Sequence, residues 1–171
     1  KINLCTATAK GEKAIIGRST PDSFSLYVSI PFCPSRCSYC SFVSHAIDKA
    51  SRLIPDYLEK LTEELKITAQ IAKRNGLTLK TIYIGGGTPT TLEAPELEIL
   101  LNCIKENFDT ENLLEYTVEA GRPDTITAEK LRVLRAHGVD RVSVNPQTME
   151  DSVLEAIGRR HTAQDIVDAM E

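Results

Sequence analysis

Hydrophobic and polar positions follow two different periods along the chain. Short runs rich in β-branched residues predict strands, and longer runs with apolar residues three or four positions apart predict helices. The predicted strands cover residues 26–30, 81–84, 115–118 and 141–144. The predicted helices cover residues 55–74, 95–107, 128–137 and 149–157, and a fifth helix begins after residue 162. Each predicted strand therefore precedes a helix.

This alternation predicts an α/β fold. Strands separated by helices imply right-handed crossovers and a parallel sheet, and about four such units would make half of a barrel. We expect residues 25–171 to form this domain and residues 1–24 to form an N-terminal extension, with a turn at residues 10–13 that indicates a short hairpin. The chain starts without Met and stops inside a predicted helix. We therefore expect a fragment of a longer protein, with an open sheet edge.

Composition narrows the class of protein. The chain has 171 residues, of which 42% are hydrophobic, so a packed core is expected. The net charge of -4 argues against a broad basic surface for nucleic acid. No apolar run approaches the roughly 18 residues that a membrane span needs, and no signal peptide pattern is present. We predict a cytoplasmic protein with neither a membrane span nor a nucleic-acid partner.

The cysteines are the strongest chemical signal. Cys33, Cys37 and Cys40 have the spacing C-x3-C-x2-C, whereas an odd total of five cysteines is a poor disulfide framework. Thiolates are soft ligands that suit iron–sulfur clusters. A structural zinc site needs a fourth ligand, for which the nearest histidine is His45. The pattern favours a 4Fe-4S cluster with one iron open to a ligand, with zinc as the alternative. Cys103 is expected to be a buried apolar side chain.

Polar or glycine-rich segments follow the other predicted strands. Gly85, Gly86 and Gly87 either let a ligand approach the backbone or simply form a tight turn. Glu119 either receives a hydroxyl or amino group of a ligand or pairs with a basic side chain, and Gln147 follows the last strand. Parallel α/β folds bind ligands at the carboxyl ends of their strands, where all these segments should meet. This convergence favours a functional role for them.

These residues resemble the radical S-adenosylmethionine superfamily. More narrowly, they are similar to the oxygen-independent coproporphyrinogen III oxidase (coproporphyrinogen dehydrogenase) family, which includes a haem chaperone branch. The similarity lies in residues 27–33, 33–40, 83–90, 119, 147 and 157–161. It implies that residues 25–171 are the N-terminal part of a radical SAM TIM-type barrel.

The resemblance also implies roles for individual residues. Cys33, Cys37 and Cys40 would hold three irons, and S-adenosylmethionine would bind the fourth. Contacts with S-adenosylmethionine are implied for Tyr27, Tyr39, Gly86, Gly87, Thr88, Glu119, Gln147 and Arg159. Arg159 suits a carboxylate, because a guanidinium can bind both carboxylate oxygens at once. The alternative interpretation is that Arg159 is a solvated charge at a helix end. Arg122, Arg159 and Arg160 would serve the carboxylates of a tetrapyrrole substrate.

The implied reaction is reductive cleavage of S-adenosylmethionine. A flavodoxin or ferredoxin type of donor would supply the electron. The deoxyadenosyl radical would then remove a hydrogen from a propionate of coproporphyrinogen III, and loss of carbon dioxide would leave a vinyl group. The protein would supply position and dry surroundings.

Two positions depart from the oxidase pattern. Phe42 stands where the oxidases have a further cysteine, and Ser29 stands where they have a histidine. An aromatic residue at position 42 is typical of the chaperone branch, whereas residues 119–123 and 145–148 resemble a dehydrogenase branch of anaerobic bacteria. Three hypotheses follow: a radical enzyme of tetrapyrrole synthesis, a haem-binding and transfer protein, and a non-catalytic metal-binding module.

Overall fold

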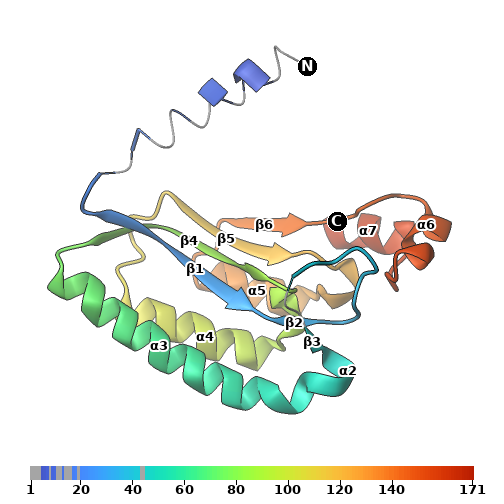
Figure 1. The fold of residues 1–171 in the computed structure, drawn as a ribbon, viewed down its shortest axis with the longest axis horizontal. Coiled ribbons are helices and arrows are strands. Elements are labelled where there is room, and N and C mark those ends of the chain that lie inside the picture. The colour runs from blue at the N-terminus through green and yellow to red at the C-terminus, as the bar shows by residue number, and fades with distance from the viewer. Residues whose placement is uncertain (1–4, 8, 11–12, 14–16, 19, 43–44) are drawn as a thin grey trace.

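A parallel sheet forms the centre of the molecule. The computed structural model describes residues 5–7, 9–10, 13, 17–18, 20–42 and 45–171. Its four-stranded sheet has the order β1-β4-β5-β6 (Figure 1). The strands are β1 (Ser23–Ile30), β4 (Thr78–Gly86), β5 (Glu115–Ala120) and β6 (Arg141–Val144), and every neighbouring pair is parallel. The predicted α/β fold with a parallel sheet is confirmed.

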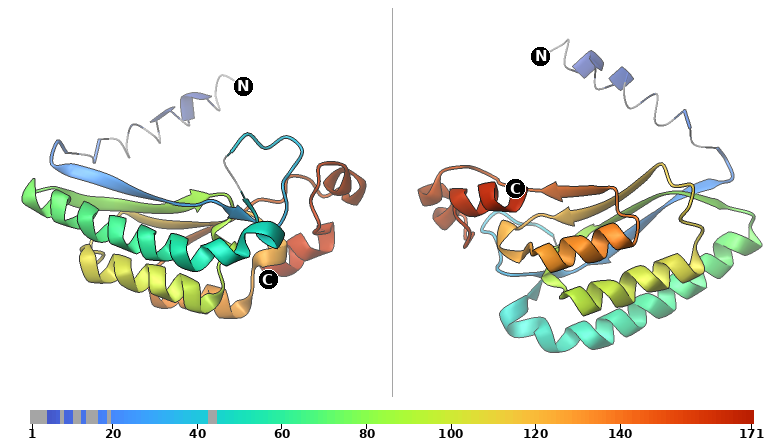
Figure 2. Two further views of the ribbon diagram at one scale, coloured as in Figure 1. Left: turned by 60° about the horizontal axis from the view of Figure 1, so that its bottom comes forward. Right: turned by 180° about the vertical axis from the view of Figure 1, so that it is seen from behind.

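Helices cover one face of this sheet. The covering helices are α3 (Ile54–Arg74), α4 (Ala94–Asn107) and α5 (Ala128–Ala136), and α4 packs between the other two (Figures 1 and 2). The short helix α2 (Ile47–Ala50) precedes α3, while α6 (Asp151–Ala156) and α7 (Ala163–Met170) lie at the end of the sheet where the strands finish. The short strands β2 (Phe32–Cys33) and β3 (His45–Ala46) form a separate parallel pair. The opposite face of the sheet is covered by none of the helices α3, α4 and α5 (Figure 2).

Side chains alternate between the two faces of the sheet. In β1, Leu26, Val28 and Ile30 are buried against the helices, whereas Tyr27 is 60% exposed on the opposite face. From the helix layer, the apolar positions of α3 and α4 complete this core. They include Leu58, Leu61, Leu65, Leu97, Leu100, Leu101 and Ile104. Burying one such aliphatic side chain contributes about 1.5–3 kcal/mol. The fold is therefore stabilised mainly from its covered face.

Some predicted boundaries were wrong. Strands β1 and β4 begin earlier than predicted, at Ser23 and Thr78, and β4 includes Gly85 and Gly86. The helix predicted from residue 149 begins at Asp151, because the hydroxyl of Thr148 accepts a hydrogen bond from the Glu150 N–H outside the helix. These errors arise where sheet pairing or a local turn overrides propensity.

Two further predictions concern the N-terminal extension and membrane-spanning helices. The hairpin expected at residues 10–13 includes residues 11 and 12, which lie outside the described residues, so it stays a prediction. In the part of the chain that the structure describes, no helix has the length and apolar character needed to cross a membrane.

Candidate functional site

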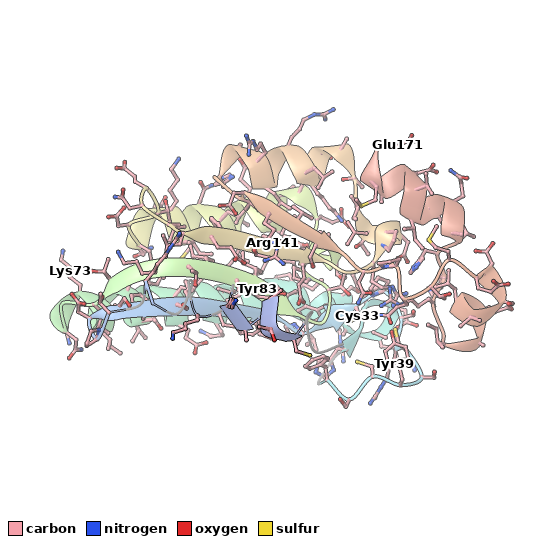
Figure 3. The ribbon with its side chains drawn as sticks, turned by 90° about the horizontal axis from the view of Figure 1, so that it is seen from above. Cys33, Tyr39, Lys73, Tyr83, Arg141 and Glu171 are labelled. Atoms are coloured by element: carbon pink, nitrogen blue, oxygen red, sulfur yellow. The ribbon has the colours of Figure 1, made fainter. Side chains whose placement is uncertain are left out.

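A cleft lies at the carboxyl edge of the sheet, beside the loop of residues 33–40, which we name the cysteine loop. Cys33 and Tyr39 lie at this end of the molecule, and Lys73 lies at the opposite end (Figure 3). The lining residues are Cys33, Cys37, Tyr39, Cys40, Phe42, Gly86, Gly87, Thr88, Glu119, Gly121, Arg122, Ser143, Asn145, Gln147 and Arg159. All the residues predicted to hold the cluster or S-adenosylmethionine, except Tyr27, therefore line one cleft.

The cysteine loop is fixed from two sides. At its start, β2 pairs with β3, and the His45 N–H donates to the Pro31 carbonyl over 2.7 Å. Further along, the Ser38 N–H donates to the Ile157 carbonyl over 3.0 Å, and the Ser35 hydroxyl donates to the Gly158 carbonyl over 2.8 Å. The segment 157–161 thus holds the loop through its backbone. The three loop cysteines are free thiols of intermediate exposure.

The glycine run packs directly against the cysteine loop. The Gly87 N–H donates to the Ile30 carbonyl, and the Thr88 N–H donates to the Phe32 carbonyl, each over 2.8 Å. Thr88 Oγ1 also lies 3.4 Å from Cys33 Sγ. A Cβ at Gly87 would lie 2.7 Å from the Phe32 oxygen and 3.0 Å from that sulfur. The glycine is therefore needed for a close approach between two segments of the protein.

Glu119 belongs to a polar cluster on the open face of the sheet. The Tyr83 hydroxyl donates to Glu119 Oε1 over 2.6 Å, and this hydrogen bond is the main cause that raises the pKa of Tyr83 to about 12. Tyr27 stacks on Tyr83 with ring centroids 5.9 Å apart. A Cβ at Gly85 would meet all three side chains within 3.1 Å. Within the described residues Glu119 forms no ion pair, so the salt-bridge interpretation is wrong. Tyr27 lies beside the cleft and does not line it.

Arg159 is held inside the cleft wall. Its Nη1 donates to the Gly121 and Asn145 carbonyls over 3.0 and 2.9 Å, and its Nη2 donates to the Tyr39 hydroxyl over 3.5 Å. The side chain is buried, so the interpretation as a solvated charge at a helix end is wrong. Its Nε has no hydrogen-bond partner among the described residues. A buried, unpaired donor of this kind matches an anionic ligand group.

Gln147 has an unusual backbone. It is the one non-glycine residue with a positive φ in the described chain, at 65°. The Gln147 N–H donates to Asn145 Oδ1 over 3.3 Å, which holds the turn after β6. A non-glycine residue in this region costs about 1–3 kcal/mol, and such strain gathers at functional sites. The position of Gln147 in the cleft lining is consistent with its predicted contact.

Arg122 lies in a different environment from the one that the sequence predicts. It was expected to face the carboxylates of a large ligand, but its side chain is only 3% exposed and bonds to Ser35 and Cys37 of the cysteine loop. Arg160, by contrast, is exposed. The contact of Arg122 spans more than eighty residues of chain, so no local pattern could have revealed it.

The donor set fits an iron–sulfur cluster. Among the described residues, no group of three or more His, Cys, Asp or Glu side chains is arranged to hold one metal ion. In a four-iron cluster the thiolates bind different irons, so three separate thiols along one cleft suit it.

Comparison with known proteins identifies the family. The sequence model of the Radical SAM superfamily matches residues 27–171. The oxygen-independent coproporphyrinogen-III oxidase-like protein HemZ of Bacillus subtilis is 43% identical over 148 residues, which are 86% of this chain and 30% of HemZ. The heme chaperone HemW of the same organism is also 43% identical over 148 residues, 86% of this chain and 38% of HemW.

A solved structure agrees with these sequence relatives. Coproporphyrinogen III oxidase HemN from Escherichia coli, described as a radical SAM enzyme, superposes with a TM-score of 0.77 at 26% identity. The match covers 94% of this chain and 36% of HemN. The chain thus spans about a third of the length of these relatives, and its four βα units match part of the HemN α/β fold. Because the family model matches most of its length, the chain belongs to the radical SAM superfamily.

Proposed function

We propose that the full-length protein containing this chain holds a 4Fe-4S cluster through Cys33, Cys37 and Cys40 and binds S-adenosylmethionine in the same cleft. We further propose that its substrate is coproporphyrinogen III, whose propionates it decarboxylates oxidatively to vinyl groups. One observation carries the proposal: three free thiols, a glycine run, a carboxylate and a buried guanidinium line a single cleft. When bound, the cluster supplies the electron that cleaves S-adenosylmethionine reductively.

Two side chains of the cleft are arranged to bind the ammonium group and the carboxylate of an amino-acid ligand. Tyr83 occupies Oε1 of Glu119, which leaves Oε2 free to accept a hydrogen bond from an ammonium or ribose hydroxyl. Arg159 lines the cleft and offers the Nη2 side of its guanidinium, next to Tyr39, to a carboxylate. The carbonyls of Gly121 and Asn145 fix the guanidinium plane. This pre-organisation reduces the ordering cost of binding.

Tyr39 has a position suited to covering the ligand. It lies between two of the cysteines and is 53% exposed in the cleft lining. Burial raises the pKa of Tyr39 above its ordinary value. Because a tyrosine with its ordinary pKa is already neutral at physiological pH, the phenol carries no charge. A neutral phenol can stack on a planar base without adding negative charge near the thiolates.

The test uses the full-length protein, reconstituted anaerobically with iron and sulfide. We expect cleavage of S-adenosylmethionine and a vinyl product from coproporphyrinogen III, with flavodoxin or ferredoxin as electron donor. Cys37→Ala should lose the cluster spectrum and both reactions. Cys103→Ala is the matched control, because Cys103 is a buried cysteine of α4 outside the cleft.

Three outcomes would revise the proposal. Cleavage of S-adenosylmethionine without turnover of the tetrapyrrole would reject the substrate and keep the radical chemistry. A native cluster spectrum in Cys37→Ala would reject the ligand assignment. Zinc alone after anaerobic purification would favour a non-catalytic metal-binding module.

One observation favours a haem chaperone as the second candidate. Phe42 lines the cleft and is 67% exposed, which offers an apolar surface for a flat tetrapyrrole. A HemW relative has the same identity to this chain as HemZ. Titration of the full-length protein with haem distinguishes the candidates: binding without decarboxylation supports the chaperone, and no binding removes it.

A further inference from the structure

Arg122 is a buried charge beside the candidate cluster site. It lies two residues after the end of β5, its side chain is 3% exposed, and it belongs to none of the contacts assigned above to S-adenosylmethionine. A buried guanidinium is stable only if charges or acceptors surround it. The groups around Arg122 therefore indicate its role.

Those groups come from the cysteine loop and from Asp124. Arg122 Nη2 donates to the Ser35 hydroxyl over 2.8 Å, and Nη1 donates to the Ser35 carbonyl over 3.3 Å. Nη1 also lies 3.5 Å from Cys37 Sγ, within hydrogen-bond distance for sulfur. Nε faces Asp124 Oδ1 over 3.5 Å. The two Nη groups therefore contact the cysteine loop, whereas Nε makes the ion pair with Asp124 and no hydrogen bond within the described chain.

The acceptors around Arg122 indicate that Cys37 Sγ is a functional partner. Asp124 is 25% exposed, and its Oδ1 also lies 3.7 Å from His161 Nδ1. It is the one carboxylate that pairs with Arg122 in the described chain. A neutral thiol would be a weak acceptor for the Nη1 donor, whereas a thiolate bound to iron would make a charge-assisted hydrogen bond with it.

We propose that Arg122 is a positioning residue that donates a hydrogen bond to the Cys37 sulfur and raises the reduction potential of the cluster. This inference rests on the proposed function, because it requires the cluster. Reduction adds a negative charge, which a positive donor at a ligand sulfur stabilises. Arg122 would thus ease the entry of the electron, and its bonds to Ser35 would keep the donor in place.

A redox titration followed by electron paramagnetic resonance tests the inference. The full-length protein is reconstituted anaerobically and titrated without S-adenosylmethionine. Arg122→Met should shift the midpoint potential to a more negative value. Arg122→Gln, which loses the charge but keeps an amide donor, should shift it in the same direction by less.

Two controls separate this effect from charge and from loop structure. Arg36→Met removes an exposed guanidinium from the same loop, and its midpoint should match that of the wild type. Ser35→Ala removes the hydroxyl that links Arg122 to Gly158 but leaves the sulfur contact. It should lose iron faster to a chelator, and its midpoint should lie closer to that of the wild type than the midpoint of Arg122→Met does.

The outcomes are distinguishable. Wild-type midpoints in both Arg122 variants, or an equal shift in Arg36→Met, would overturn the inference and leave the proposed function intact. If Arg122→Met holds no iron, the midpoint potential of Arg122→Gln tests the inference instead. Loss of iron from both variants would overturn the inference, because it would assign Arg122 a purely structural role in holding the cysteine loop. If the wild-type protein itself forms no cluster, the proposed function fails first.

Discussion

The covered face of the sheet and the cleft at its carboxyl edge are built from opposite kinds of residue. Under α3 and α4, fully buried aliphatic side chains such as Ile82, Ile84 and Leu100 fill the core. At the cleft, buried side chains include Arg122 and Arg159, and glycines bring backbone segments together. The covered face stabilises the fold through apolar burial and carries no candidate functional group. The cleft holds the candidate functional groups in position, and its buried charges and close backbone contacts lower the stability of the fold. Substitutions in one region therefore show whether the other region depends on it.

The largest effect on stability is expected in the helix layer. Leu100→Ala removes a side chain with 0% exposure and should lower the free energy of unfolding by about 2–5 kcal/mol, because a cavity remains. Ile99→Ala, on the same helix but 55% exposed, should change it by less than about 0.5 kcal/mol. Chemical denaturation of the full-length protein measures both. Loss of iron from folded Leu100→Ala would show that the two regions are not separable.

A smaller loss of stability with a specific loss of iron is expected at the glycine run. Gly87→Ala places a Cβ against the Phe32 carbonyl and Cys33 Sγ, so the strain should be about 1–3 kcal/mol. Displacement of the cysteine loop should also lower the iron content after reconstitution. Gly121→Ala is the control, because its Cβ would meet no atom within 4 Å although it lines the same cleft. Equal iron contents in the two variants would contradict this reading.

A change in ligand affinity alone is expected at the tyrosine that positions Glu119. Tyr83→Phe removes the hydroxyl that donates to Glu119. The Kd for S-adenosylmethionine should rise about tenfold, or about 1.4 kcal/mol, because the carboxylate is no longer oriented. Equilibrium dialysis with the reconstituted protein measures the Kd. Tyr57→Phe, which removes a hydroxyl bonded to the Ser29 carbonyl on the covered side, should leave it unchanged.

The smallest effect is a dependence on pH near the cleft. Burial lowers the pKa of His161 below its ordinary value, and the charge of Arg159 reinforces this. Above about pH 6.5 the histidine is neutral in both the folded and unfolded states and contributes nothing. Below that pH the unfolded chain binds the proton first, so stability falls by at most about 1.4 kcal/mol per pH unit until the folded state is protonated too.

Urea denaturation at pH 5.5 and 7.5 checks this dependence. His161→Asn should lose less stability between the two conditions than the wild type does. His45→Asn changes an exposed histidine and should behave as the wild type. The same pH dependence in all three proteins would assign the effect to other groups.

Much of the site was predictable because its signals are local. The spacing of Cys33, Cys37 and Cys40 is a property of eight consecutive residues, and the glycine run and Glu119 each follow a recognisable strand. Short strands β2 and β3 were missed, because two-residue pairs have no detectable period. The reason for Gly87 was also hidden, since the atoms that forbid a side chain there belong to residues 32 and 33.

The sequence by itself determined the alternation of strands and helices, and with it a parallel sheet whose carboxyl edge collects the cysteines, Glu119 and Gln147. It did so because side-chain periodicity and ligand spacing are set within a few neighbouring residues. Only the tertiary structure decided that Arg122 and Arg159 are buried and that Arg122 meets Cys37 across 85 positions of chain. Such contacts depend on how separate elements pack against one another, and the hydrophobic periodicity of a single element does not determine that packing.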